Sequence, residues 1–370
     1  MAALVGSCRT HDERLAGWPG GETSWTREKN LPMNGDAASV DVWLSGPGSS
    51  AEPAEWPSVT VVTPTLGDRA DLLEQTLRAV KDQDYPGQVD CIVVLDKRSG
   101  DIGQLAGDES GWENTRKVAV SLGARVLVND RTPGLAGTRN TGIMAASGEF
   151  VANCDDDDYW LPGKLRAQVT ALLAEPAAAV ACCGIAVEYG GEVFDRVHAA
   201  PVVVLRDLLR DRLMALHVST FVSRRAALLD GVGLVNEELP GSRNEDYEFL
   251  LRAARFGPVV NVPRPGVHVR WHTQRRAMYG RWPLVAKAQP WLLENYPEFR
   301  TVPAGYARIA GQAAFAFAAC GDRAQALRWV GKTLRANPRE RRAYLAFGVA
   351  LKVVNADSVV RWLHRRGRGL

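Results

Sequence analysis

From Pro57 onward, short apolar runs alternate with longer segments in which apolar residues recur every three or four positions. The short runs have the length of buried strands, and the longer segments have the period of amphipathic helices. Strands this apolar, joined by helices, predict a parallel sheet covered on both faces, that is, an α/β nucleotide-binding half of the doubly wound type. We expect strands at Ser58–Thr63, Val89–Leu95, Arg125–Val128 and Phe150–Cys154, and helices at Ala70–Asp82, Gly111–Leu122 and Leu135–Ala146.

The pattern becomes mixed after Pro162 and helical toward the end of the chain. The stretch AFAACGDRAQALRWVGKTLRANP resembles a helix-turn-helix of the tetratricopeptide type, but one or two such units are too few to stand alone. We therefore expect these helices to pack on the rest of the chain or on a partner. The expected helices are 163–173, 205–213, 245–256, 304–320, 323–336 and 340–353, and the expected strands are 178–188 and 217–222.

These changes of pattern divide the chain into three regions. Residues 1–56 are rich in Gly, Pro, Ser and charge and are expected to form an irregular extension. Residues 57–275 are expected to form the mixed α/β sheet, and residues 276–370 a helical appendage.

Composition agrees with a folded, water-soluble protein: 46% of residues are hydrophobic and 24% are charged. The net charge of only +3 does not indicate a nucleic-acid binder. The six cysteines show no metal-binding spacing, which favours free thiols in a reducing compartment. No apolar run approaches the ~20 residues that span a bilayer, and the first residues lack the apolar core of a signal peptide. We expect a cytoplasmic protein, whose basic C-terminal residues leave open a peripheral contact with the inner face of the membrane.

Four consecutive carboxylates, Asp155 to Asp158, follow the expected strand that ends at Cys154. Crowded like charges need a compensating cation or full solvation. If the extended backbone continued past Cys154, Asp155 and Asp157 would lie on one face. Two hard oxygen ligands at the carboxyl edge of a parallel sheet suit Mg²⁺ or Mn²⁺ bound together with a diphosphate, whereas a solvated acidic loop is the alternative.

Together with its flanking motifs, this run resembles a known enzyme family. The segments PTLGDR, VVLDKRSGD, GLAGTRNTGIMAASGEF and DDDDYWLPGKL are similar to those of the family 2 inverting glycosyltransferases of GT-A fold, from about Pro57 to Trp271. The resemblance implies transfer of a sugar from a nucleotide-diphosphate sugar to an acceptor, with inversion and with Mn²⁺ or Mg²⁺ as cofactor. It also implies that Asp157 and Asp155 bind the metal, with Asp155 nearer the ribose. Asp156 would belong to the nucleotide-sugar site, and Asp158 would lie beside them in a supporting role.

The same resemblance implies a pocket for the base of the donor. Pro64 and Thr65 would cradle the base, and Asp96 would accept the imide N–H of uracil or thymine. Lys97 and Arg98 stand where Asp-Gly is frequent in the family. The expected contact of Asp96 favours a UDP-sugar, whereas the departure at Lys97 and Arg98 leaves dTDP- and GDP-sugars open.

A Gly-rich segment precedes Arg139 at the start of an expected helix. Glycines permit close approach of the backbone, and the free N–H groups of a helix N-terminus attract phosphate. Arg139 would add a fork-shaped cation. The segment matches neither a Rossmann nor a Walker motif, so a plain helix start is the alternative to diphosphate contact.

Candidates for the acceptor side lie further along the chain. Glu245 and Asp246 begin an expected helix, where carboxylates also serve as ordinary caps. Resemblance to the Glu-Asp motif of the family implies that Asp246 is the general base and that Glu245 orients it or binds the acceptor. His272 shares a face with His268 and Arg270 in the expected strand. It is a candidate to bind the metal or to hold the pyrophosphate, and surface exposure is the alternative.

Two other functions stay open: a sugar nucleotidyltransferase, and a non-catalytic module that binds nucleotide sugars or other proteins. The sequence does not identify the acceptor, which could be a saccharide, lipid, peptide or small molecule. A homodimer formed through the C-terminal helices is a further option.

Overall fold

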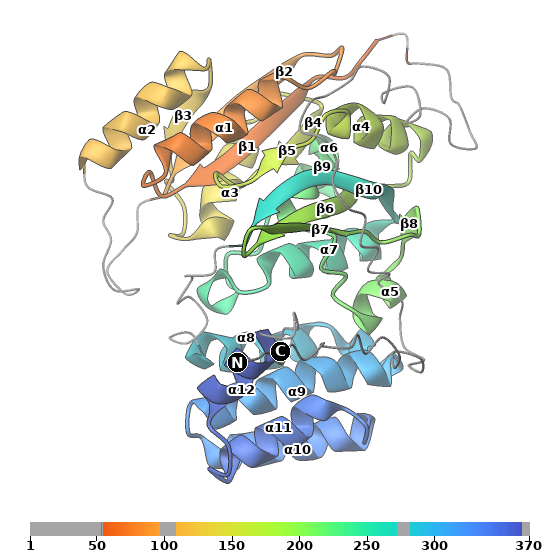
Figure 1. Ribbon diagram of the computed structural model, residues 1–370. Coiled ribbons are helices and arrows are strands. Elements are labelled where there is room, and N and C mark those ends of the chain that lie inside the picture. Colours follow the sequence, from red (N-terminus) through yellow and green to blue (C-terminus); the bar gives the residue numbers. More distant parts are fainter. Residues whose placement is uncertain (1–52, 54, 97–108, 272–281, 365–370) are drawn as a thin grey trace, which may run out of the picture.

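The computed structural model describes residues 53, 55–96, 109–271 and 282–364, and these form a ten-stranded mixed sheet with helices on both faces and a helical appendage (Figure 1). The α/β class expected from the sequence is therefore confirmed. Along the sheet, the strand order is β3-β2-β1-β4-β9-β6-β10-β5, with β7 paired to β6 and β8 to β10.

The first half of the sheet is parallel, as the apolar runs predicted. It consists of β1 (Val59–Thr65), β2 (Val89–Leu95), β3 (Arg125–Val128) and β4 (Phe150–Asn153). The three connecting helices are α1 (Ala70–Lys81), α2 (Glu109–Ser121) and α3 (Leu135–Ala145). The carboxyl ends of β1 and β4 therefore meet at the same edge, where the acidic run begins.

The second half mixes strand directions. β9 (Val222–Arg224) runs antiparallel to both β4 and β6 (Val180–Tyr189), and so joins the two halves. The remaining strands are β5 (Tyr159–Trp160), β7 (Glu192–Arg196), β8 (Val202–Val203) and β10 (Val259–Arg270). The helices are α4 (Lys164–Ala174), α5 (Leu205–Arg210), α6 (Arg225–Asp230) and α7 (Glu245–Phe256).

Alternate residues of the central strands feed two separate cores. On β1, Val62 packs on the side of α3 and α7, whereas Val61 packs with Leu165 of α4 on the other side. This alternation is the period-two pattern of a sheet that is buried on both faces.

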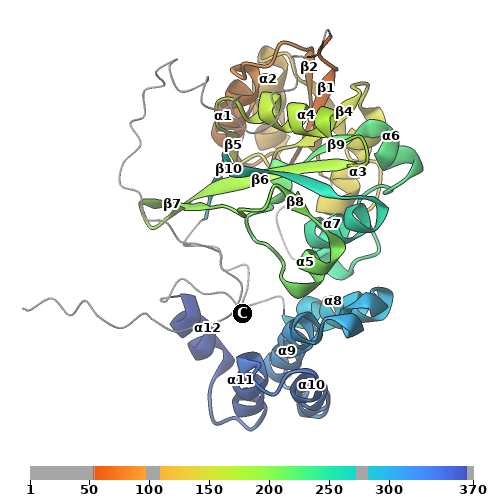
Figure 2. The same cartoon turned by 90° about the vertical axis from the view of Figure 1, so that its right-hand side faces the viewer.

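The appendage packs on the rest of the chain, as the sequence predicted, and Figure 2 shows it beside α5 and α7. One buried apolar cluster runs from Val62 in the sheet through Tyr247 of α7 to Phe315 in the appendage. The expected boundary at residue 275 stays a prediction, since this core is continuous across it. The helices are α8 (Trp282–Asn295), α9 (Pro303–Ala319), α10 (Arg323–Ala336), α11 (Arg341–Ala350) and α12 (Ala356–His364). Among the described helices, none combines the length and the apolar character needed to cross a membrane.

The strand expected at 217–222 is wrong. Val218–Thr220 form a 3-10 turn, and only the short β9 follows it. The Thr220 hydroxyl donates to the His217 carbonyl at 2.6 Å, and the His217 side chain accepts from the Ser219 N–H at 3.4 Å. Such local bonds of polar side chains compete with the ladder of a strand.

Candidate active site at the acidic turn

The four aspartates lie on a turn between β4 and β5, and not on an extended strand. Strand β4 ends at Asn153, and the Asp158 N–H donates to the Asp155 carbonyl at 3.2 Å. The Thr76 hydroxyl of α1 holds the turn from outside by donating to the Asp158 carbonyl at 2.6 Å. The expected alternation, with Asp155 and Asp157 on one face, is therefore wrong, because the turn directs Asp155 toward Arg139 and Asp157 toward Arg69.

Arg69, just before α1, bridges two of the aspartates. Its guanidinium donates to Asp156 at 2.6 Å and also to Asp157. The Thr65 hydroxyl at the end of β1 donates to the other oxygen of Asp156 at 2.6 Å. Burial nevertheless raises the pKa of Asp156 to about 7, against the effect of the nearby arginine. The carboxyl edge of β1 is thus tied to the turn.

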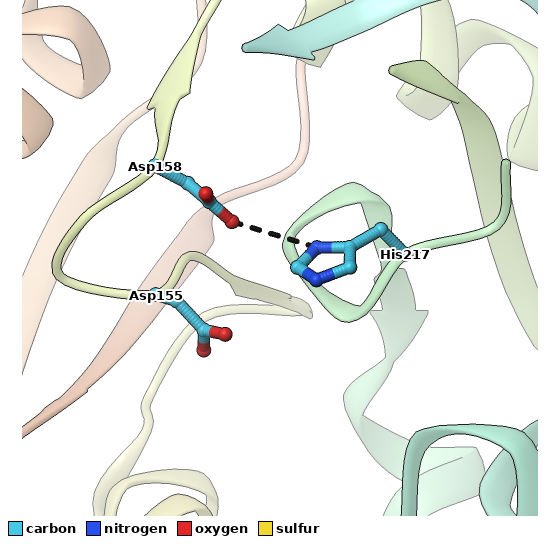
Figure 3. A group of neighbouring side chains, drawn as sticks. All are labelled: Asp155, Asp158 and His217. Carbon is cyan, nitrogen blue, oxygen red and sulfur yellow. Dashed lines mark ion pairs between the residues drawn. The ribbon is translucent and has the colours of Figure 1, made fainter. Parts of the chain in front are cut away.

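The other two aspartates face a histidine. Asp155, Asp158 and His217 each place one ligand atom within 4.8 Å of the others (Figure 3). The Asp158 carboxylate lies 3.4 Å from His217 Nδ1 and accepts a 2.5 Å hydrogen bond from the Ser219 hydroxyl. Burial raises the pKa of Asp158 well above its usual range and lowers that of His217. The neutral imidazole that this favours has a lone pair that can bind a metal.

Arg139 joins the acidic turn to helix α7. It is 1% exposed, and its guanidinium donates to Asp155 and to Glu245, each at 2.8 Å. The expected helix start is confirmed, but the structure places the Arg139 guanidinium between two carboxylates. Diphosphate contact by Arg139 stays a prediction, and its observed contacts are structural. They fix the first turn of α7 relative to the turn after β4.

Asp246 follows Glu245 in the first turn of α7 and is held by Arg212. One guanidinium nitrogen donates to both Asp246 oxygens at 2.9 and 2.8 Å, and the other donates to the Asn244 side chain at 2.9 Å. Burial opposes ionisation of Asp246, but Arg212 outweighs it and lowers the pKa. Burial and the neighbouring Asp246 raise the pKa of Glu245. Arg212 therefore favours the ionised form of Asp246.

A cavity of about 240 Å³ opens beside Asp246. Leu213, Leu216 and Leu250 contribute apolar walls, and Arg212, His217 and Trp271 also line it. This volume lies just below the usual range of small-molecule pockets, which begins at about 300 Å³. A carboxylate next to a partly apolar cavity is the arrangement expected where a general base takes a proton from an acceptor bound in that cavity.

The expected donor residues lie along the carboxyl ends of β1 and β2. Pro64 and Thr65 are in β1, paired with Val94 and Leu95 of β2. Asp96 follows β2, and its carboxylate accepts from the Gly134 N–H at 3.1 Å and from the Asn129 side chain at 2.9 Å. Asp96 therefore anchors the loop before α3. Its contact with a base stays a prediction.

Two cations of the site were not singled out from the sequence: Arg69 and Arg212. The signal for them was the acidic run itself, because four clustered carboxylates require positive partners. Spacing could not identify which arginines these would be. His272, Lys97 and Arg98 lie outside the described residues.

The ligand atoms gathered at the acidic turn fit a divalent cation. Within the described part of the chain, five of the six carboxylates of the acidic turn and the start of α7 lie near three arginines, Arg69, Arg139 and Arg212. The sixth carboxylate, that of Asp158, lies near His217 instead, so the carboxylates outnumber these cations. This excess of negative charge accompanies the raised pKa values of Asp156 and Asp158. Carboxylate oxygens and a neutral imidazole are ligands that Mn²⁺ accepts readily.

Comparison with protein families finds a match that includes the acidic turn. Residues 60–231 match the family described as "Glycosyl transferase family 2". Over 72 residues the chain is 40% identical to the Escherichia coli UDP-Glc:alpha-D-GlcNAc-diphosphoundecaprenol beta-1,3-glucosyltransferase WfgD, covering 19% of this chain and 28% of that protein. Over 160 residues it is 27% identical to the Bacillus subtilis putative teichuronic acid biosynthesis glycosyltransferase TuaG, covering 43% of this chain and 59% of that protein. The chain thus spans 28 to 59% of the length of the curated relatives it matches.

Solved structures show the same fold over most of the chain. S. aureus TarS 1-349 in complex with UDP-GlcNAc aligns with a TM-score of 0.54 and 18% identity, covering 84% of this chain and 92% of that one. A further crystal structure of S. aureus TarS 1-349 aligns with a TM-score of 0.53 and covers the same shares of the two chains. The GT-A type architecture implied by the motifs is therefore confirmed.

Proposed function

Residues 60–231 belong to glycosyltransferase family 2, and on this premise we propose that the protein transfers a sugar from a nucleoside diphosphate sugar to an acceptor hydroxyl. The observation that carries the proposal is the bridge made by Arg139. By contacting Asp155 and Glu245 together, it brings the acidic turn and the start of α7 to one place. The donor side and the acceptor side of a transferase would meet there.

Asp246 is proposed as the general base. Arg212 favours its ionised form and contacts both carboxylate oxygens, and Asp246 lines the adjoining cavity. An acceptor hydroxyl in that cavity would give its proton to Asp246 as its oxygen attacks the anomeric carbon, opposite the departing nucleoside diphosphate. A single displacement of this kind inverts the anomeric configuration. Glu245, bonded to Arg139, would position the base.

Asp155, Asp158 and His217 are proposed to hold a divalent cation, with Asp157 and His272 as the further ligands predicted from the sequence. When bound, Mn²⁺ or Mg²⁺ would stabilise the negative charge of the leaving diphosphate. Asp156 and Thr65 would shape the nucleotide-sugar side, since the Thr65 hydroxyl already positions that carboxylate.

A UDP-sugar is the proposed donor. WfgD uses UDP-Glc, and the aligned TarS structure contains UDP-GlcNAc. WfgD and a Campylobacter jejuni relative are both named for acceptors linked to undecaprenol through a diphosphate. A lipid-linked saccharide is therefore the acceptor class to test first, and it would bring the protein to the inner face of the membrane.

The test is release of nucleoside diphosphate from a panel of UDP-, dTDP- and GDP-sugars, with Mn²⁺ and with a chelator. Asp246→Asn should leave donor binding intact, measured by calorimetry, and lower turnover by about 10²-fold or more, the usual scale for a general base. Glu238→Gln, at an exposed carboxylate of the same region, is the matched control and should keep parent turnover. Parent-level turnover in Asp246→Asn would show that another residue is the general base.

The metal part is tested separately. Asp155→Asn and Asp157→Asn should weaken Mn²⁺-dependent donor binding, whereas Asp90→Asn, at an exposed position on β2, should not. Donor binding that is equal with chelator and with Mn²⁺ would contradict the metal site. Pyrophosphate formation in place of nucleoside diphosphate release would identify a nucleotidyltransferase, and absence of both would favour a binding module.

A further inference from the structure

The C-terminal helices carry a positive net charge, whereas the net charge of the other residues is negative. Residues 323–362 contain nine Lys or Arg residues and two Asp or Glu residues, a net charge of +7, while the whole chain carries only +3. The remaining residues are therefore acidic overall. A segment this basic attracts polyanions and anionic surfaces.

Within this basic segment, one face of α11 is apolar and exposed. Tyr344, Phe347 and Leu351 follow one another at helical spacing and are 58, 46 and 37% exposed. The turn after the helix continues the stripe with Val353 and Val354, which are 77 and 43% exposed. Five exposed apolar residues in one short segment form a patch of the kind that marks an interaction surface.

The turn is held in a specific shape. The N–H groups of Val353 and Val354 donate to the Gly348 carbonyl at 3.0 and 3.3 Å, which folds the turn back onto α11. Lys352 has a φ of 59°, a left-handed conformation that glycine adopts without strain. The chain therefore keeps a cation at a position where the backbone favours glycine, and it keeps that cation beside the two exposed valines.

We propose that this surface, formed by Arg341, Tyr344, Phe347, Leu351, Lys352, Val353 and Val354 and called here the α11 surface, binds the headgroup region of an anionic bilayer. Cations stand at both ends of the apolar stripe, the arrangement in which apolar side chains enter the interface while basic groups contact acidic headgroups. A second copy that packs through the same surface is disfavoured as the occupant because it would bring the basic segments of the two chains together. The inference deepens the membrane contact of the proposed function and names the surface responsible.

The test is flotation of the purified full chain with vesicles of phosphatidylcholine alone or with 30% phosphatidylglycerol, without any sugar donor. Binding should require the anionic lipid and weaken at high salt. Arg341→Gln/Lys352→Gln should lower the partition coefficient by about 25-fold, at about fivefold for each basic group. Phe347→Ser and Val353→Ser should each weaken binding severalfold. The matched controls on α2, Arg116→Gln and Val120→Ser, remove an exposed cation and an exposed valine and should bind like the parent.

Val353 is the most exposed of the changed apolar residues, so Val353→Ser should fold normally, which circular dichroism verifies. Equal binding of the α11 and α2 variants would overturn the proposal, as would absence of binding to anionic vesicles. Binding to poly-glutamate but not to vesicles would assign the surface to an acidic protein instead. A dimer in sedimentation equilibrium that Val353→Ser dissolves would assign it to a second copy. Because no step uses a donor, failure here leaves the glycosyl transfer proposal intact.

Discussion

Removal of the buried cation at Arg139 should destabilise the protein strongly. Arg139→Met keeps most of the side-chain volume but deletes two charge-assisted hydrogen bonds of 2.8 Å, one to Asp155 and one to Glu245. Both carboxylates then lose their shared partner in a region where Arg139 itself is 1% exposed. Breaking a buried ion pair from one side costs about 3–5 kcal/mol. Two charged hydrogen bonds at about 1.5–3 kcal/mol each give about 3–6 kcal/mol, which overlaps that range.

The loss should be measured by urea denaturation in the presence of chelator. It should be smaller at pH 5.5 than at pH 8, because burial raises the pKa of Glu245 and removal of the cation raises it further. A carboxyl group with a raised folded-state pKa favours the folded state at low pH, and this contribution is lost as the pH rises through that value. Arg139→Met/Glu245→Gln should therefore recover part of the loss at pH 8.

Arg78→Met provides the matched control. Arg78 pairs with Glu74 on the exposed side of α1, with 60% of its side chain accessible, and such pairs contribute at most about 0.5 kcal/mol. A loss for Arg139→Met below about 1 kcal/mol, or equal to that for Arg78→Met, would refute the argument that this arginine holds the acidic turn and α7 together.

Two further predictions concern backbone positions and are measured by thermal and urea denaturation. Gly142→Ala would place a Cβ 2.3 Å from Val62 Cγ1, so overpacking should cost about 1–3 kcal/mol, whereas Gly331→Ala, with no atom within 4 Å, should stabilise α10 by up to about 1 kcal/mol. Equal effects at these two glycines would contradict the packing described for α3 on β1. Lys352→Gly should relieve the left-handed strain and stabilise the protein by about 1 kcal/mol while weakening vesicle binding; a destabilised variant would show that the turn is not strained.

Much of the fold could be predicted because it depends on local periodicity. The strand Val89–Leu95 and the helix Glu245–Phe256 have the bounds that the apolar pattern indicated. The pattern failed at 217–222, where the His217 side chain and the Thr220 hydroxyl bond locally and a turn replaces the strand. Periodicity carries no information about such polar competition.

The candidate site was predictable in its residue types and less so in its geometry. The acidic run and the Glu-Asp pair were found because their clustering is unusual. Their partners depend on contacts distant in sequence: Arg69 reaches Asp156 across 87 positions, and Arg139 reaches Glu245 across 106. The burial that turns Arg139 into a bridge is a property of the packed chain, and a helix-start motif cannot reveal it.

The contacts between the appendage and α7 would fix the distance between the catalytic site and the membrane surface. Arg308 of α9 donates to the Tyr247 hydroxyl at 2.9 Å, and the Tyr296 hydroxyl donates to Glu248 at 2.7 Å. Tyr247 and Glu248 follow directly after Asp246 in the sequence. With the α11 surface seated on a bilayer, a stack of packed helices, and not a flexible tether, would determine how far above the lipid the acceptor hydroxyl must stand. This fixed distance would select acceptors by the length of their headgroup.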